Sequence, residues 1–236
     1  MFDSTAFDAL NASLTPPASP PASPLASPPT APRIGLRRRP RAARLKRCLD
    51  MAAAFAALVL LAPALLLIAA AVGLTSPGPI LFRQKRTGLN GRVFTIFKFR
   101  TMTVTEDGAT VTQATRNDAR VTPVGAVLRQ TSLDELPQLL NVLRGEMSFV
   151  GPRPHALVHD AHYSALIPGY DQRFAVRPGL TGYAQIQGLR GEIRQLDCMA
   201  RRVAADAAYA RNWSLSGDLG IVLRTAPLLI SRQNAY

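Results

Sequence analysis

The sequence predicts a mixed α/β protein, rich in helix, in which one long apolar helix precedes a compact domain. Three observations support this fold class. The stretch from Met51 to Leu74 is apolar throughout, which is roughly the 20 residues that a helix needs to cross a bilayer. Alternating apolar residues between Ile80 and Phe99 surround the turn signal Asn90-Gly91, so they predict a β-hairpin. Leucines at helical spacing follow Ser132, and they predict a helix with one apolar face.

Three regions of the chain differ in composition. Residues 1–36 are rich in Pro, Ala and Ser, with repeats such as TPPASPPASPLASPPTAP. Repeated proline removes backbone donors and small side chains bury little surface, so this tail is expected to be disordered. Residues 37–74 combine a basic run with the apolar stretch, and residues 75–236 are expected to form the compact domain.

The net charge of +13 fits nucleic acid, an anionic membrane surface or phosphate-bearing substrates. The sequence contains no DNA-reading motif or aromatic stacking platform, so nucleic acid is not an expected partner. Membrane lipid is an expected partner, because a basic run directly before an apolar stretch attracts anionic head groups by about 1 kcal/mol per residue. The basic run comprises Arg37, Arg38, Arg39, Arg41, Arg44, Lys46 and Arg47.

Side chains that bind transition metals are few. Cys48 and Cys198 do not form a short secreted-type framework, so both are expected to be reduced thiols in a cytoplasmic setting. His155, His159 and His162 could share one face of a helix, but no carboxylate or cysteine clearly completes a zinc-binding set. The sequence therefore does not favour a zinc site.

The apolar stretch has a proline at its middle. Pro63 removes one helical hydrogen bond there, and its ring clashes with the preceding turn. Both flanks of the stretch are basic, which favours a cytoplasmic location for both ends; the second flank comprises Arg83, Lys85, Arg86 and Arg92. A helix that enters the membrane, breaks at Pro63 and returns would satisfy both observations. From these residues alone, a straight spanning helix remains the alternative.

The compact domain is expected to follow the hairpin with a polar loop and several helices. The loop is Thr103 to Asp118, and helices are predicted from about Ser132, at His155–Ser164, at Asp197–Asn212 and at Leu219–Ile230. The last of these is apolar and amphipathic, interrupted by Arg224 and Pro227. Such a helix is expected to lie on the membrane interface.

The helix that follows Ser132 carries two adjacent carboxylates. Ser132 and Glu135 have the spacing of a capping box. The predicted buried stripe comprises Leu133, Leu136, Leu139, Leu140 and Leu143, and the opposite face comprises Asp134, Gln138 and Asn141. Acidic residues in a first turn also complement the helix dipole, so Asp134 and Glu135 by themselves do not require a catalytic interpretation.

The surroundings of this acidic pair favour a phosphate-handling site. The cations concerned are Arg129, Lys98 and Arg100 in KFRTM, Arg153 in GPRP, and Arg177 in RPGLTG. Arginine offers a fork for phosphate oxygens, and glycine lets backbone amides approach them closely. An ionised aspartate can serve as the nucleophile in phosphoryl transfer.

From about Leu45 to Thr225, the chain resembles the bacterial sugar transferases called monotopic phosphoglycosyl transferases. The resemblance is carried by KRCLD, SPGPILFRQKRTGLNGRVFTIFKFRTM, RVTPVGAVLRQTSLDELPQLLNVLRGEMSFVGPRP, VRPGLTGYAQIQG and DAAYARNWSLSGDLGIVLRT. These enzymes initiate the assembly of capsule, exopolysaccharide and related glycans. Several motifs in the same order over most of the chain make this a far more specific signal than the acidic pair.

The resemblance implies a reaction between a UDP-sugar and undecaprenyl phosphate. Asp134 matches the family nucleophile, which attacks the sugar-bearing phosphorus, releases UMP and forms a covalent phosphosugar-aspartyl intermediate. Glu135 matches the partner carboxylate, whose role is left open as base, metal ligand or positioner. Mg²⁺ is the expected cofactor, with Asp134 as its candidate ligand. Direct attack by the lipid phosphate, without a covalent intermediate, is the alternative chemistry.

The resemblance also implies substrate-binding residues. Those expected to contact phosphate or nucleotide are Lys98, Arg100, Arg129, Arg153, Arg177, Pro178, Gly179, Thr181, Gly182 and Gln185. The usual tryptophan of the TGWAQ motif is Tyr183 here. The motifs cover phosphate and nucleotide contacts and do not identify the sugar.

Finally, the resemblance favours the membrane hairpin over the straight span. The family has a re-entrant helix broken at a Ser-Pro pair, and the corresponding pair here is Ala62-Pro63. The proline is kept, but the hydroxyl that could satisfy a freed carbonyl is absent. The expected location is the bacterial inner membrane, with the catalytic domain facing the cytoplasm and downstream glycosyltransferases using the product.

Overall fold

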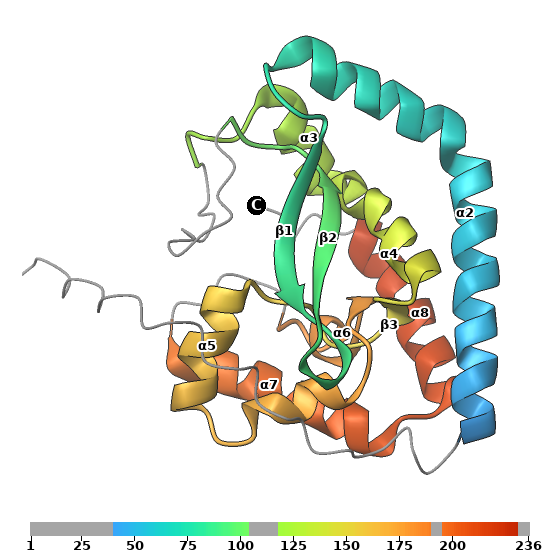
Figure 1. The fold of residues 1–236 in the computed structure, drawn as a ribbon, viewed down its shortest axis with the longest axis vertical. Helices are drawn as coiled ribbons and strands as arrows, with labels where there is room; N and C mark the ends of the chain where they lie inside the picture. The colour runs from blue at the N-terminus through green and yellow to red at the C-terminus, as the bar shows by residue number, and fades with distance from the viewer. Residues whose placement is uncertain (1–39, 104–117, 190–194, 231–236) are drawn as a thin grey trace, which may run out of the picture.

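Short helices and two small sheets lie beside one long N-terminal helix (Figure 1). The computed structural model describes residues 40–103, 118–189 and 195–230. Its elements are α2 (Pro40–Thr75), β1 (Leu81–Thr87), the 3-10 turn η2 (Leu89–Gly91), β2 (Val93–Phe99), α3 (Pro123–Thr131), the 3-10 helix η3 (Leu133–Gln138), α4 (Leu139–Arg144), β3 (Ser148–Val150), α5 (Leu157–Leu166), the 3-10 helix η4 (Tyr170–Ala175), β4 (Gly179–Thr181), α6 (Tyr183–Ile186), α7 (Leu196–Asn212) and α8 (Leu215–Ile230). The predicted tail and most of the predicted polar loop lie outside the described residues.

Helix α2 is continuous over 36 residues and includes Pro63. It runs along one side of the domain, bends in its middle, and leads back over the end that carries α3 (Figure 1). Proline bends a helix because it removes one hydrogen bond and its ring displaces the preceding turn. The expected break at Pro63 is therefore a bend within one helix.

One side of α2 packs on the domain and the other exposes large apolar side chains. Ala54 and Val72 are buried against different parts of the core, where they join α4 and α3 respectively. By contrast, Leu60 is 79% exposed and Leu74 is 88% exposed. Within the described ranges, α2 is the one helix long and apolar enough to cross a membrane. Such a large apolar surface is typical of a membrane contact.

Strands β1 and β2 form the expected antiparallel hairpin. The register runs from Leu81 opposite Phe99 to Thr87 opposite Val93. Asn90 and Gly91 both have positive φ, at 55° and 76°. Asparagine and glycine tolerate this left-handed conformation best, which explains why the pair marks the turn.

A second sheet pairs β3 with β4 in parallel, and the sequence did not predict it because each strand has three residues. The two backbone segments of this sheet approach each other closely at glycine residues. A Cβ on Gly151 would lie 2.1 Å from the Arg177 carbonyl oxygen, and one on Gly182 would lie 2.2 Å from the Gly151 carbonyl oxygen. These glycines therefore let two chain segments cross. The expected approach of their backbone amides to phosphate stays a prediction.

The segment after Ser132 differs from the predicted amphipathic α-helix. Ser132 has a φ of 57° and ends α3, and the first six residues beyond it form η3. The capping box is wrong, because the Ser132 side chain makes no cap and the Glu135 side chain bonds to cations instead. The faces are also misassigned: Leu133 is 36% exposed, whereas Asn141 is fully buried.

The other three predicted helices agree with the structure to within a few residues. Helices α7 and α8 cover the two predicted C-terminal segments, and α8 continues through Pro227. Helix α5 starts two residues later than expected, because an isolated β-bridge to Arg86 holds Ala156 in extended chain. Helix α3 was not predicted, although Thr122 caps it and Pro123 occupies its first turn, both of which are typical start signals.

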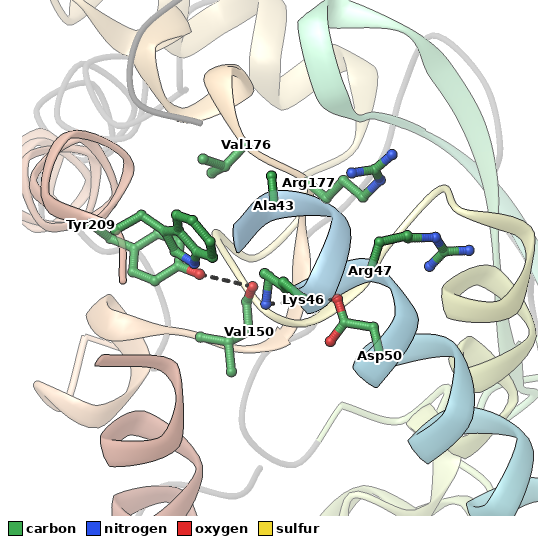
Figure 2. A pocket seen from close by; sticks show the side chains of 9 residues that line it. Ala43, Lys46, Arg47, Asp50, Val150, Val176, Arg177 and Tyr209 are labelled. Atoms are coloured by element: carbon green, nitrogen blue, oxygen red, sulfur yellow. Dashed lines mark hydrogen bonds and ion pairs between the residues drawn. The ribbon is translucent and has the colours of Figure 1, made fainter. Parts of the chain in front are cut away.

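Part of the basic run points into the protein. Lys46 Nζ donates to Asp218 Oδ2 at 2.6 Å, and Arg47 donates to the carbonyls of Val142 and Leu143 at 2.6 and 3.0 Å. Figure 2 shows both side chains lining a small pocket between α2 and Val150. These two residues were expected to contact lipid, but they fasten α2 to the domain.

Asp218 is the acceptor at which α2, α7 and α8 meet. Its carboxylate also accepts from the Tyr209 hydroxyl at 2.8 Å and from Trp213 Nε1 at 3.0 Å. Asp50 forms a second anchor on α2, because its carboxylate accepts from Ser148 Oγ at 2.7 Å. The N-terminal part of α2 is thus attached by buried charges.

We expect Asp218→Asn to destabilise the protein by about 3–5 kcal/mol, because it leaves Lys46 buried without its nearest counter-charge. The thermal unfolding midpoint in detergent should fall by roughly 6 °C or more. Asp197→Asn is the matched control, since the Asp197–Arg201 pair is exposed and such pairs contribute little. Equal shifts in the two variants would contradict the anchoring role.

Candidate functional site

Glu135 lies at the centre of the candidate site, between two cations. Lys98 Nζ lies 2.8 Å from Glu135 Oε1. Arg153 binds the same carboxylate with both ends of its guanidinium, at 2.5 Å to Oε1 and 3.1 Å to Oε2. Because Lys98 comes from β2, Glu135 from η3 and Arg153 from the segment after β3, the site joins three separate parts of the chain.

The charges in this cluster stabilise one another. Burial alone would raise the pKa of Glu135, but Arg153 and Lys98 outweigh it and hold that pKa well below its usual range. Burial lowers the pKa of Lys98, against the opposing attraction of Glu135. Glu135 raises the pKa of Arg153. Glu135 is therefore ionised at neutral pH, and both of its oxygens accept hydrogen bonds.

The neighbouring carboxylate, Asp134, differs from Glu135 in its hydrogen bonding and in the direction of its pKa shift. It is 9% exposed, and none of the residues that the structure describes donates a hydrogen bond to it. Burial and the adjacent Glu135 raise the pKa of Asp134 to about 6, against Lys98, Arg153 and Arg129. At neutral pH the carboxylate is mostly ionised and has oxygens available to a ligand or an electrophile.

Adjacent positions in η3 place the two carboxylates in different surroundings. Successive side chains of a 3-10 helix point about 120° apart, so adjacent residues face different surroundings. Glu135 thereby meets Lys98 and Arg153, while Asp134 does not pair with either.

Asn141 fastens β2 beside the site, and its role was not predicted. Its Oδ1 accepts from the Phe97 amide at 3.1 Å, and its Nδ2 donates to the Thr95 carbonyl at 2.7 Å. The same Nδ2 donates to Glu146 Oε2 at 2.7 Å. Asn141 therefore fixes the strand next to Lys98. An asparagine inside a leucine-rich helix, where it is unfavourable, was the available signal.

Among the other predicted cations, Arg129 acts on Asp134 and Arg100 does not reach the pair. Arg129 is half-buried at the end of α3, and its charge lowers the pKa of Asp134. Arg100 is buried and donates to the carbonyls of Ser76 and Pro77 at 2.6 and 2.7 Å. Gly78 leaves room for this guanidinium, because a Cβ there would lie 2.3 Å from Arg100 Nη1.

The predicted nucleotide-binding segment makes other contacts. Arg177 Nε donates to the Gly145 carbonyl at 2.9 Å, and its side chain lies beside Arg47 (Figure 2). Thr181 Oγ1 bonds to Thr225 Oγ1 at 2.7 Å, and Gln185 Nε2 donates to the Leu180 carbonyl at 3.2 Å. Pro178, Gly179 and Gly182 belong to the crossing of β3 and β4. The described contacts of this segment are thus with β3 and the residues after it, with α8, and with Gly145 after α4.

Within residues 40–103, 118–189 and 195–230, no three His, Cys, Asp or Glu side chains come together as a metal cluster. The histidines are not gathered either, because His155 is buried and its Nδ1 lies 2.8 Å from the Tyr170 hydroxyl oxygen. Magnesium needs less than such a cluster, since it commonly binds through one or two carboxylates and substrate phosphates. The available carboxylate of Asp134 fits that requirement.

Comparison with known proteins identifies relatives over most of the chain. The sequence profile of the bacterial sugar transferase family matches residues 41–232. A UDP-glucose:undecaprenyl-phosphate glucose-1-phosphate transferase from Caulobacter vibrioides is 59% identical over 191 residues, which are 81% of this chain and 72% of that protein.

Two further relatives differ in length. An enzyme of the same name from Escherichia coli is 54% identical over 181 residues, covering 77% of this chain and 39% of that protein. Exopolysaccharide production protein PSS from Rhizobium leguminosarum is 45% identical over 196 residues, covering 81% of this chain and 98% of that protein. The chain thus matches nearly all of the Rhizobium protein and less than half of the Escherichia coli enzyme.

The two carboxylates should respond oppositely to neutralisation. Glu135→Gln leaves Lys98 and Arg153 buried with their shared counter-charge removed, so we expect a loss of about 3–5 kcal/mol. Asp134→Asn removes a buried charge that repels Glu135, so we expect the stability to be unchanged or raised. Thermal unfolding of the two variants side by side checks this. A larger loss for Asp134→Asn than for Glu135→Gln would contradict the division of roles.

Proposed function

The chain belongs to the bacterial sugar transferase family, and on this premise we propose that it transfers a sugar 1-phosphate from a UDP-sugar to undecaprenyl phosphate. The products are UMP and a lipid-linked diphospho-sugar, as in the first step of exopolysaccharide synthesis. The names of the Caulobacter and Rhizobium relatives support this reaction and pathway. Glucose is the proposed sugar, because four of the related enzymes are named for UDP-glucose.

The observation that carries the proposal is the contrast between Asp134 and Glu135. An oxygen of ionised Asp134 attacks the sugar-bearing phosphorus of the donor, and the bond from that phosphorus to the UMP oxygen breaks. UMP leaves with the electron pair. An oxygen of the lipid phosphate then attacks the same phosphorus and releases the Asp134 carboxylate. Both nucleophiles are anions, so neither step needs a general base.

The fixed cations hold the donor. Lys98 and Arg153 are held in place by Glu135, so their positive charge is oriented before the substrate arrives. Such preorganised charge stabilises a transition state more than mobile charge does. Arg129 adds a third cation near Asp134. In this account Glu135 orients the cations and does not transfer a proton.

Magnesium is the proposed cofactor, and the available Asp134 carboxylate would contact it together with the donor diphosphate. When bound, the ion supplies charge neutralisation for the diphosphate and the leaving UMP. The residues of the chain supply the nucleophile and the remaining positive charge.

We further propose that α2 is a re-entrant membrane helix in the bacterial inner membrane and that the domain faces the cytoplasm. The bend in α2 (Figure 1), its exposed leucines and its two basic flanks support this path. Helix α8, with Leu219 and Leu223 exposed, is the proposed interfacial helix. An enzyme at the membrane surface need not extract its isoprenoid substrate, at about 0.8 kcal/mol per CH₂. The product would pass to membrane-associated glycosyltransferases.

Asp134→Asn should reduce UMP release from UDP-glucose, with Mg²⁺ and undecaprenyl phosphate present, by at least about 10³-fold, because an amide oxygen is a poor nucleophile. Mass spectrometry of the wild-type enzyme incubated with donor alone should find a hexose phosphate on the Asp134 peptide. Asp197→Asn, on the exposed face of α7, should retain its rate. Full activity of Asp134→Asn would refute the site, and activity without the adduct would favour direct attack by the lipid.

The re-entrant path can be tested with single cysteines at Arg38 and Arg92, in a chain whose own Cys48 and Cys198 are serines. Both positions should react with a membrane-impermeant maleimide only in inverted vesicles, because both flanks face the cytoplasm. A cysteine at Asp197 provides the reference for the cytoplasmic side. Labelling of the two flanks from opposite sides would establish a spanning helix.

A further inference from the structure

Arg153 is held in place by its backbone as well as by Glu135. It lies between Pro152 and Pro154, and prolines have no N–H with which to join a sheet. Three successive carbonyls in this segment accept bonds from three different elements. Gly179 N donates to Pro152 O at 2.9 Å, Arg173 Nη2 donates to Arg153 O at 2.5 Å, and Arg86 Nη1 donates to Pro154 O at 3.2 Å.

Arg173 makes the middle one of these bonds from within the core. The residue belongs to η4 and is 3% exposed. Its guanidinium also donates to the Tyr170 hydroxyl at 2.7 Å and contacts His155 Nδ1. Because guanidinium has donors only, that ring nitrogen must be an acceptor. Burial and the charge of Arg173 lower the pKa of His155, so His155 is neutral.

Two buried carboxylates balance the charge of Arg173. Asp206 Oδ2 lies 3.1 Å from Nη2, and Asp160 Oδ1 lies 3.6 Å from Nη1. The Tyr170 hydroxyl donates to the same Asp160 oxygen at 2.7 Å. Burying an arginine with two aspartates is costly, and apolar residues of similar volume often stabilise a core as well or better. Stability alone therefore does not account for this buried charged cluster.

We propose that Arg173 is a positioning residue for the transfer reaction and acts through Arg153. By holding the Arg153 carbonyl, it sets the point from which the Arg153 side chain reaches Glu135 and the donor diphosphate. A side chain as long as arginine converts a small backbone shift into a misplaced guanidinium, and a misplacement of about 1 Å can cost roughly 100-fold in rate. The inference rests on the proposed function of the carboxylate site.

A double-mutant cycle tests this coupling. Arg173→Lys keeps the positive charge and loses the fork that reaches several acceptors at once. We expect it to lower the single-turnover rate of UMP release from UDP-glucose by about 10- to 100-fold in the wild-type background. In the Arg153→Lys background the same substitution should cost less than about 2-fold, because the group through which it acts is already altered.

Matched controls separate positioning from folding. Arg201→Lys, on the exposed face of α7, should leave the rate unchanged in both backgrounds. All rates are measured well below the unfolding midpoint of each variant. Should Arg173→Lys not fold, Asp206→Asn takes its place in the cycle, because it removes a carboxylate that holds the guanidinium.

The possible outcomes are distinct. Losses that multiply in the double variant, with Asp134→Asn inactive, would overturn the positioning role of Arg173 and leave the proposed function intact. Full activity of Asp134→Asn would overturn the proposed function and this inference with it. If Arg173→Lys lowers the rate of UMP release only in the wild-type background, the result supports both the proposed function and the positioning role of Arg173.

Discussion

The ionised Glu135 between Lys98 and Arg153 is the interaction on which the site depends. A buried carboxylate is costly unless opposite charges and hydrogen bonds replace its water. Here both oxygens are occupied, one by two cations and the other by the second arm of the arginine. Since the three residues come from β2, η3 and the segment after β3, satisfying one charge requires these elements to meet.

That arrangement also leaves the adjacent carboxylate without a hydrogen-bonding partner among the described residues, which supports the nucleophilic role proposed for it. Lys98 and Arg153 both bond to Glu135, and Asp134 experiences them only as nearby charges. Its raised pKa records the cost of leaving a buried carboxylate without a bonded partner. In the proposed reaction this division lets one acidic pair supply both the carboxylate that orients the cations and the nucleophile.

The long helix is connected to the same site through its buried charges. Arg47 on α2 bonds to the last carbonyls of α4, in the manner of a side-chain cap. Helix α4 follows η3 directly and carries Asn141, which holds β2 beside Lys98. Hence the element proposed to lie in the membrane and the carboxylates proposed to do the chemistry share one continuous set of contacts. A lipid phosphate at head-group depth would then meet a site in a fixed orientation.

Local sequence patterns were enough to locate most helices and the hairpin, and to indicate which kinds of side chain the site contains. Helical and alternating periodicity located α7, α8 and the β1–β2 hairpin, because these patterns reflect which side of a short segment is apolar. Motif order, together with Asp134, Glu135, Lys98, Arg129 and Arg153, indicated the site. The contacts of four other residues became visible only in the folded chain. Arg100 bonds to the turn at Ser76 and Pro77, Gly151 and Gly182 allow two segments to cross, and Asn141 bonds to β2 beside the site. The physical reason is that these roles arise from contacts between distant segments, such as Asn141 with Phe97, and no local pattern specifies them.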